Sequence, residues 1–307
     1  MIENEVIIVN GIPDDNYQML IEECVKYAII SLPFTVDRMS IPNAVKRALN
    51  ITKGKVAEAL FKYFCNSNNI HPDFDSCTTP FWTIDKKDFL LNDGEWDIKN
   101  NFLYHTNDLL QSYNYTNLPA LIPNSFSGDQ WSKRDEHIFN TNHESNFLFT
   151  FLKNADLVNG NRGEEFLEIV LTNDQQSFIN ELYDKYEGRP QSCQPFFEQW
   201  FWDEMNKRGG HQYFEIHFKP CLIITAYANS NYWNLFKNTG RLDNANNFQT
   251  HLNPPWYIKT PKGSCNFLSG TLWTTTTNST IPVSQLPSFL SLFPTLRNNI
   301  NCAIIKS

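Results

Sequence analysis

The sequence predicts an α/β or α+β fold in which helices flank a mixed β-sheet and an additional C-terminal segment follows. Two observations support this prediction. Apolar residues recur at helical spacing through much of the chain before about residue 66. Beyond the proline at position 80 the period changes to that of extended chain, and short apolar segments bounded by turn residues continue to about residue 228.

The N-terminal part predicts one strand and one long helix. Residues 4–10 are apolar enough for a short strand, which would end at the turn formed by residues 11–13. Asp14 or Asp15 then supplies an N-cap for a helix that continues to about residue 31, because apolar positions in this stretch follow helical spacing.

Two further helices are predicted before residue 67. The first has Ser40 as its N-cap and Pro42 in its first turn, where proline is tolerated. The second opens at Thr52 or Gly54, and its apolar residues fall on one helical face up to about residue 66.

Short strands dominate the middle of the chain. We expect them at residues 81–85, 88–91, 96–99, 118–123, 147–152, 166–172, 212–218 and 221–228. The sequence Asn92-Asp93-Gly94 predicts a tight hairpin turn, and Asp174 predicts the cap of a helix to about residue 186. A boundary near residue 190 would separate a core with its N-terminal helices, residues 1–190, from a C-terminal segment, residues 191–307, that serves substrate contacts or dimerisation.

Composition favours an intracellular protein, and we expect it in the cytoplasm. Hydrophobic residues make up 41% of the chain and charged residues 19%. There is no N-terminal secretory pattern and no apolar stretch long enough to cross a membrane. The seven cysteines are scattered without a Cys-x-x-Cys pair, which argues against a disulfide framework or a zinc ribbon.

The charge distribution leaves nucleic-acid binding open. The formal net charge of −8 disfavours it. Between positions 37 and 62, however, basic residues outnumber acidic ones by six to two. The basic residues are Arg38, Lys46, Arg47, Lys53, Lys55 and Lys62, and the acidic ones are Asp37 and Glu58. This cluster is either a binding surface or an ordinary solvated helix face. The 24 Phe, 12 Tyr and 8 Trp residues either fill the core or provide stacking surfaces.

The predicted hairpin carries the residues with the clearest chemistry. Asp88 stands at the start of its first strand, and Asp97 and Lys99 lie on its second. Side chains alternate along a strand, so Asp97 and Lys99 point the same way while Ile98 packs inward. Two carboxylates with a backbone carbonyl between them are the hard oxygen ligands that Mg²⁺ prefers. A nearby lysine can orient a water molecule or stabilise developing negative charge.

This arrangement resembles the PD-(D/E)XK, or restriction-endonuclease-like, superfamily. Lys87-Asp88 corresponds to the Pro-Asp element and Asp97-Ile98-Lys99 to the second motif, while Glu58 in Gly-Lys-Val-Ala-Glu-Ala-Leu matches the glutamate of the preceding helix. The resemblance covers residues 54–99. Lys87 replaces the family's proline, and Asp85 is therefore the alternative first acid.

The resemblance implies a restriction-endonuclease-like core and a Mg²⁺-dependent endonuclease that hydrolyses DNA phosphodiester bonds, most similar to type II restriction enzymes. Asp88, Asp97 and the carbonyl of Ile98 would hold Mg²⁺, for which Mn²⁺ could substitute. Glu58 would be a third or indirect ligand, and Lys99 would act in catalysis. The DNA, expected to be double-stranded, would be contacted by Lys55, Lys87, Lys133 and Arg134, and a homodimer is a possible assembly.

Two other interpretations remain open. The charges of the hairpin could be solvated, with Asp97 and Lys99 forming a simple cross-strand ion pair. The chain could also be a non-catalytic, aromatic-rich module that binds carbohydrate or protein. The sequence contains no His-Glu-x-x-His, Gly-x-Ser-x-Gly or Walker motif that would point to another enzyme class.

Overall fold

The computed structural model describes residues 5–9, 12, 14–35, 41–80, 87–104, 118–122, 146–158, 161–186, 198–206, 213–229, 258–260, 263–267, 270–274, 278–298 and 303–306. The predicted strand at residues 81–85 and the predicted cap Ser40 lie outside these ranges. So do Asp85, Lys133 and Arg134.

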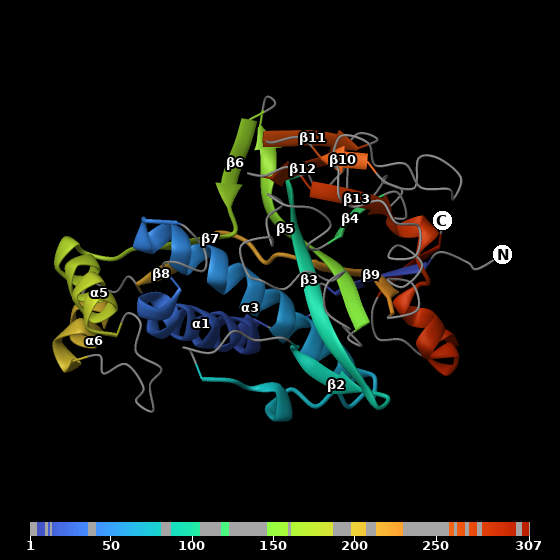
Figure 1. Cartoon of the computed structure of the whole chain (residues 1–307), viewed down its shortest axis with the longest axis horizontal. Coiled ribbons are helices and arrows are strands. Elements are labelled where there is room, and N and C mark those ends of the chain that lie inside the picture. The colour runs from blue at the N-terminus through green and yellow to red at the C-terminus, as the bar shows by residue number, and fades with distance from the viewer. Residues whose placement is uncertain are drawn as a thin grey trace.

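One mixed β-sheet organises the described part of the chain (Figure 1). Its strand order is β11 (Gly263–Phe267), β12 (Gly270–Thr274), β3 (Gly94–Tyr104), β5 (Asn146–Val158), β9 (Leu222–Ala228), β1 (Glu5–Val9) and β14 (Ala303–Lys306), while β2 (Phe89–Leu91) pairs with β3 and β6 (Asn161–Glu165) with β5. β3 and β5 run parallel, and the other pairings described in this sheet are antiparallel. The prediction of a mixed α/β fold with helices flanking a sheet is confirmed.

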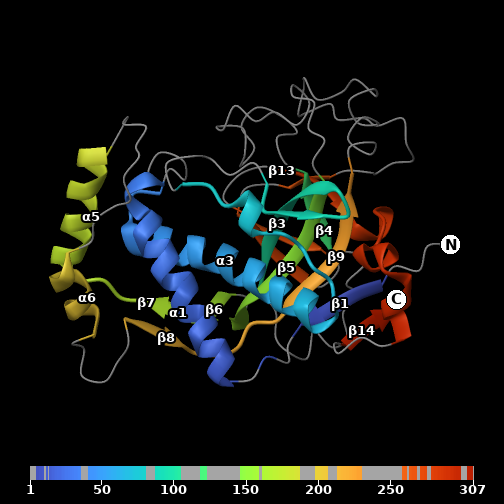
Figure 2. The same ribbon diagram turned by 90° about the horizontal axis from the view of Figure 1, so that it is seen from below.

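Two long helices lie together on one side of this sheet (Figure 2). α3 (Ala44–Ser67) contacts β3, β5, β9 and β1, and α1 (Asp14–Ser31) packs against α3. The sheet side of α3 buries Val56, Leu60, Phe61 and Phe64 in the main hydrophobic cluster. This spacing of three and four residues places them on one face of the helix, which explains why α3 binds the sheet along its length.

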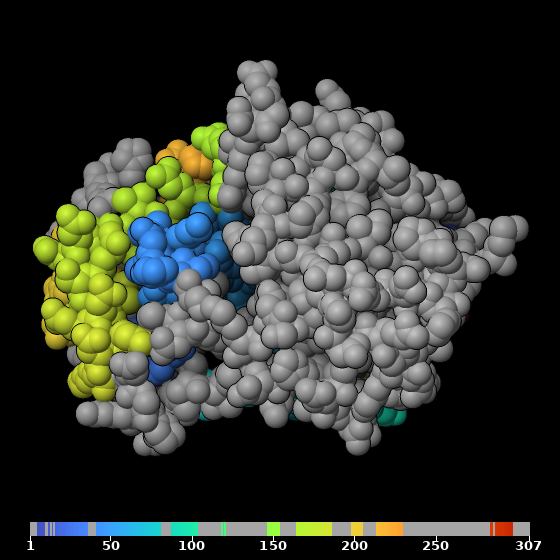
Figure 3. Space-filling view, turned by 45° about the horizontal axis from the view of Figure 1, so that its top comes forward, coloured from blue at the N-terminus to red at the C-terminus, as the bar shows by residue number. Residues whose placement is uncertain are grey.

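The remaining elements are shorter. α5 (Asn173–Tyr186) and α6 (Gln199–Asn206) lie at one end of the molecule, and Figure 3 shows α5 on the surface beside the first turns of α3. Two small sheets are formed by β10 (Ile258–Thr260), β13 (Asn278–Pro282) and β4 (Pro119–Ile122), and by β7 (Leu167–Ile169) and β8 (Phe214–Ile216). The 3-10 helices are η1 (Leu32–Phe34), η2 (Asp75–Cys77), η5 (Val283–Gln285), η6 (Phe289–Leu292) and η7 (Pro294–Asn298).

α3 corrects the prediction of two separate helices between residues 40 and 66. It is one helix whose N-cap is Asn43, with the Asn43 side chain accepting a hydrogen bond from the Lys46 N–H at 2.8 Å. Pro42 therefore precedes the helix. Gly54 lies within α3, and glycine there does not end the helix because residues on both sides of it are buried against the sheet.

The other predicted elements that fall within the described ranges are found with changed ends. α1 ends at Ser31 as expected, but Asp14 is its first residue rather than its N-cap. α5 is capped by Thr172 rather than Asp174: the Gln175 N–H donates to Thr172 Oγ1 at 3.1 Å, and the Thr172 N–H donates to Gln175 Oε1 at 2.9 Å. This reciprocal pair is a capping box.

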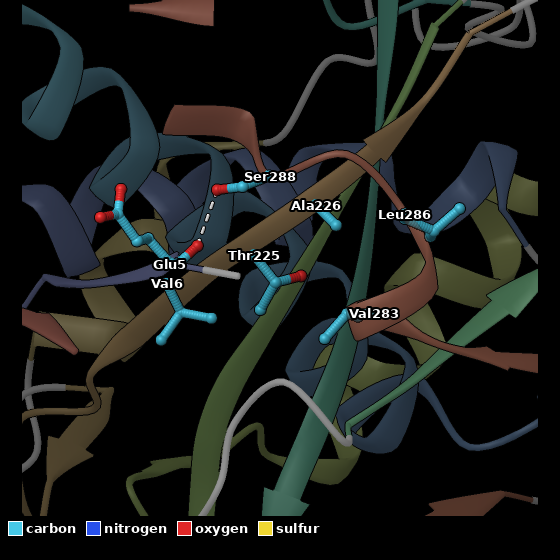
Figure 4. A pocket seen from close by; sticks show the side chains of 7 residues that line it. All are labelled: Glu5, Val6, Thr225, Ala226, Val283, Leu286 and Ser288. Atoms are coloured by element: carbon cyan, nitrogen blue, oxygen red, sulfur yellow. Dashed lines mark hydrogen bonds between the residues drawn. The ribbon is translucent and has the colours of Figure 1, made fainter. Parts of the chain in front are cut away.

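Segments from both sides of residue 190 build the main sheet. β9 lies between β5 and β1, and β12 pairs with β3. A small cavity between β1, β9 and the segment from η5 to η6 is lined by Glu5, Val6, Thr225, Ala226, Val283, Leu286 and Ser288 (Figure 4). Across it the Ser288 hydroxyl donates to the Glu5 carbonyl oxygen at 2.7 Å. Among the described helices, none is both long and apolar enough to cross a membrane.

Candidate active site

The hairpin β2–β3 positions the two predicted aspartates. Leu91 pairs with Gly94 across a turn in which Asn92 and Asp93 both have positive φ, of 50° and 59°. This is the backbone that a two-residue type I′ turn requires, and Asn and Asp tolerate it better than other non-glycine residues. The predicted hairpin turn is confirmed.

A close neighbour, rather than its own φ angle, disfavours a larger residue at Gly94. A Cβ atom at this position would lie 2.8 Å from Nδ2 of Asn146. That amide donates a hydrogen bond to the carbonyl oxygen of Glu95 at 3.2 Å. The contact fixes the start of β5 against the start of β3.

Both the backbone and the side chain of Asp88 form hydrogen bonds with the backbone of β3. Its N–H donates to the carbonyl oxygen of Trp96 at 2.7 Å, and its carboxylate Oδ2 accepts the N–H of Ile98 at 2.6 Å. The side chain is partly buried. The first acid of the predicted motif therefore lies against the backbone of the second motif, directly beside Asp97.

Asp97 and Lys99 share one face of β3, as the strand period predicts. The Lys99 ammonium lies 2.5 Å from Asp97 Oδ2, and the two side chains are 20% and 13% exposed in the order Asp97, Lys99. Lys99 Nζ also lies 5.4 Å from the centre of the Phe147 ring, which β5 places opposite Asp97. The pair lies within one strand, rather than across two strands.

α3 brings Glu58 and Lys55 to the same cluster. These residues are one helical turn apart, and Lys55 Nζ lies 2.6 Å from Glu58 Oε2. The ammonium also lies 4.7 Å from the centre of the Tyr27 ring on α1. Burial lowers the pKa of Lys55, but Glu58, Tyr27 and Asp88 together outweigh burial and raise it above its usual range.

The pKa of Asp88 is raised by burial and by neighbouring acidic residues. Burial raises it well above the usual value, and the negative charges of Glu58 and Asp97 raise it further. The Ile98 N–H and the Lys55 ammonium oppose this shift without cancelling it. The carboxylates of Glu58 on α3 and Asp97 on β3 therefore act electrostatically on that of Asp88, directly before β2. We call Glu58, Asp88 and Asp97 the carboxylate cluster.

The carboxylate cluster supplies the donor atoms that a hard divalent cation prefers, but these are engaged in other contacts. One oxygen of Glu58 contacts Lys55, one of Asp97 contacts Lys99, and Asp88 Oδ2 accepts a hydrogen bond. Within the ranges the structure covers, no three acidic, imidazole or thiol side chains already stand in a metal-coordinating arrangement. Carboxylate oxygens are suitable ligands for Mg²⁺. In the metal-free protein, Lys55 and Lys99 supply the positive charge beside them.

The basic residues expected to contact DNA have separate environments. Lys55 lies within the site, as described above. Lys87 forms an ion pair with Glu95 on the hairpin surface. Lys53, a member of the basic cluster between positions 37 and 62, is 1% exposed and pairs with Glu165 of β6, so its ammonium does not lie on the surface.

Three residues near the site were not singled out in the sequence. Phe147 and Tyr27 contact its lysines, and no local pattern signals either, because each comes from an element distant in the sequence. Asn101 lies two positions beyond Lys99, and its buried Nδ2 has no hydrogen-bond partner. The two-residue strand period could have indicated that Asn101 follows Lys99 on the same face.

Comparison with known proteins adds no family name. Neither protein-family models, nor curated proteins, nor solved structures gave a match.

Proposed function

We propose that the protein is a Mg²⁺-dependent endonuclease that hydrolyses DNA phosphodiester bonds, with a restriction-endonuclease-like core and a role similar to that of type II restriction enzymes. The observation that carries this proposal is the carboxylate cluster with Lys99 at its edge. Asp97 lies on β3, Asp88 lies directly before β2, and Lys99 is two positions beyond Asp97. This is the spacing of the motif described for the sequence.

Charge supports a cation at this site. The three carboxylates outnumber the two ammoniums, those of Lys55 and Lys99, and burial together with the neighbouring negative charges raises the pKa of Asp88. A phosphodiester brings further negative charge, and a divalent cation would reduce this repulsion. Asp88 and Asp97 would hold the ion, together with the carbonyl oxygen of Ile98, and Mn²⁺ could replace Mg²⁺.

The bound cation would neutralise the phosphate and lower the pKa of an attacking water molecule. The protein residues would do the rest. Lys99 contacts Asp97 and the Phe147 ring, which would hold its ammonium in position to stabilise the negative charge that develops on the phosphate. Glu58 would orient water or serve as a third ligand. Lys87, Lys133 and Arg134 would contact the DNA backbone, and a homodimer would allow both strands to be cut.

Cleavage assays with variants of Lys99 and Asp97 test the proposal. Plasmid and oligonucleotide substrates are incubated with Mg²⁺, Mn²⁺ or EDTA. Lys99→Ala should lower the cleavage rate by about 100-fold or more while leaving DNA affinity nearly unchanged, because Lys99 acts on charge that appears in the transition state. Asp97→Ala should abolish turnover and also weaken binding of the divalent ion.

Lys26→Ala is the matched control. Lys26 forms an exposed ion pair with Glu22 at 2.6 Å on α1 and should leave cleavage unchanged. Metal-dependent cleavage that persists in both Lys99→Ala and Asp97→Ala would place the active site elsewhere. Complete lack of metal-dependent cleavage by the unmodified protein would favour the module that binds carbohydrate or protein.

A further inference from the structure

Lys55 has an environment that a DNA-contacting lysine would not need. Its ammonium contacts Glu58 at 2.6 Å and lies over the Tyr27 ring at 4.7 Å. The side chain is about three-quarters buried, with 26% exposed. A lysine that binds phosphate usually extends into solvent, whereas Lys55 is directed inward between α1 and α3.

The position of Lys55 also concerns Asp88. The ammonium acts on the Asp88 carboxylate as well as on Glu58, so one positive charge serves two acids. Cys24 on α1, which is buried, also lies within the electrostatic influence of both Lys55 and Glu58. The ion pair lies on α3 with its ammonium over the Tyr27 ring of α1, and both side chains are about three-quarters buried, so its interactions are screened less than at the surface.

We propose that Lys55 is the counter-cation of the carboxylate cluster. Its positive charge stabilises the ionised carboxylates of Glu58 and Asp88 when no divalent ion is bound, and it thereby lowers the affinity of the cluster for that ion. This inference rests on the cation site of the proposed function and replaces the expected role of Lys55 in DNA contact. The Tyr27 ring holds the ammonium in place through a cation–π contact.

The two cations compete because they serve the same acids. A divalent ion bound by Asp88 and Asp97 would be repelled by the Lys55 ammonium, whose charge acts on Asp88. Lys55 also orients one oxygen of Glu58, which favours ion binding, but orienting one side chain contributes less than repulsion between a single and a double charge in a partly buried site. Removal of the Lys55 charge should therefore tighten divalent binding by about tenfold.

The test compares Lys55→Gln and Lys55→Met with the unmodified protein. Gln retains a hydrogen-bond donor without charge, and Met retains an unbranched apolar chain of nearly the length of the lysine stem. Mn²⁺ affinity is measured by calorimetry and by the paramagnetic resonance of free Mn²⁺, and thermal unfolding is followed in EDTA and in Mn²⁺. Both variants should bind Mn²⁺ about tenfold more tightly than the unmodified protein and unfold at a lower temperature in EDTA. The rise in unfolding temperature on adding Mn²⁺ should be larger for both variants than for the unmodified protein.

Two controls separate this role from simple packing. Lys26→Gln removes an ion pair of the same 2.6 Å length on α1 and should change neither Mn²⁺ affinity nor the gain on adding Mn²⁺. Lys55→Arg keeps the charge and should keep the Mn²⁺ affinity near its original value. Variants that fold only in the presence of Mn²⁺ would support the inference.

Several outcomes would overturn it. These are unchanged or weaker Mn²⁺ affinity in Lys55→Gln, an equal loss of thermal stability with and without Mn²⁺, and failure of both variants to fold in either condition. Failure of the nuclease proposal is a different result: Mn²⁺ binding that tightens as expected, in a protein that cleaves no DNA, would leave the counter-cation role standing. Absence of Mn²⁺ binding in every variant would remove both.

Discussion

Asp88 combines a fixed backbone contact with an unfavourable electrostatic environment. The Ile98 N–H holds its carboxylate, while burial and two neighbouring acids raise its pKa. A carboxyl group whose pKa is raised on folding binds more protons in the native state than in the unfolded chain. Native stability therefore falls as the pH rises from the unfolded pKa of about 3.9 through the raised native value.

Replacing Asp88 with Asn should accordingly stabilise the metal-free protein at neutral pH. Asn keeps an oxygen for the Ile98 N–H but carries no charge, so we expect a gain of about 0.5–2 kcal/mol, as for other substitutions that trade activity for stability. The gain should shrink toward zero below about pH 4, where Asp88 is protonated in both states. Urea unfolding in EDTA at several pH values measures it.

Asp97→Asn is the comparison for this experiment, because Asp97 has an ammonium partner. Its substitution should give no such gain at neutral pH. A loss of stability in Asp88→Asn at pH 7 would mean that the native protein stabilises the ionised carboxylate, contrary to the pKa argument.

At the scale of single residues, the sequence correctly predicted side-chain positions that depend on local spacing alone. Asp97 and Lys99 share a strand face because strands alternate, and this needs no tertiary information. The buried pairing of Lys53 with Glu165 could not be predicted, because it joins α3 to β6 across more than a hundred residues. The contact between Lys99 and Phe147 could not be predicted for the same reason, because it joins two strands that are distant in the sequence.

Among the secondary-structure elements, two glycines have opposite roles. Gly54 lies inside α3, where an added Cβ would meet nothing within 4 Å. Glycine in a helix interior costs conformational entropy on folding. Gly54→Ala should therefore stabilise the protein by about 0.5–1 kcal/mol, measured by thermal or denaturant unfolding. A loss of stability would show that α3 requires glycine at this position.

Gly94→Ala should do the reverse. The new Cβ would displace the Asn146 amide and weaken its hydrogen bond to Glu95, for an expected loss of about 1 kcal/mol. Because the close neighbour is the end of a side chain, adding Asn146→Ser should recover part of this loss, so that the two substitutions are not additive. Additive losses would place the strain in the backbone instead.

The elements also show why sequence periodicity finds helices better than their ends. The sequence predicted that a new helix opens at Thr52 or Gly54, whereas both residues lie within one helix, because tertiary burial outweighs local propensity. The cap at Thr172 depends on a side chain three residues later. β3 extends to Tyr104, well beyond the predicted strand at residues 96–99, because its pairing with β5 continues to that point.

For the whole molecule, the net charge of −8 means that the proposed DNA binding would depend on a few local cations. We expect affinity in EDTA to fall steeply with salt, because each neutralised phosphate releases counterions. Lys87→Ala should reduce the slope of log K against log salt by about one unit, since Lys87 lies on the hairpin surface beside the site. Filter binding or fluorescence anisotropy across a salt series measures this slope, with Lys26→Ala as a control that leaves it unchanged.

The pairing of β1 with β14 and β9 has a consequence for how the chain reaches its native state. β1 is synthesised first, yet both of its sheet neighbours come from beyond residue 220, with Glu5 opposite Lys306. Until those partners emerge, the apolar segment from Val6 to Val9 remains an unpaired edge, open to association with other chains. Contacts so far apart in the sequence also slow folding. Expression at lower temperature, or with chaperones that shield nascent strands, should therefore raise the yield of folded protein more than changes near the hairpin would.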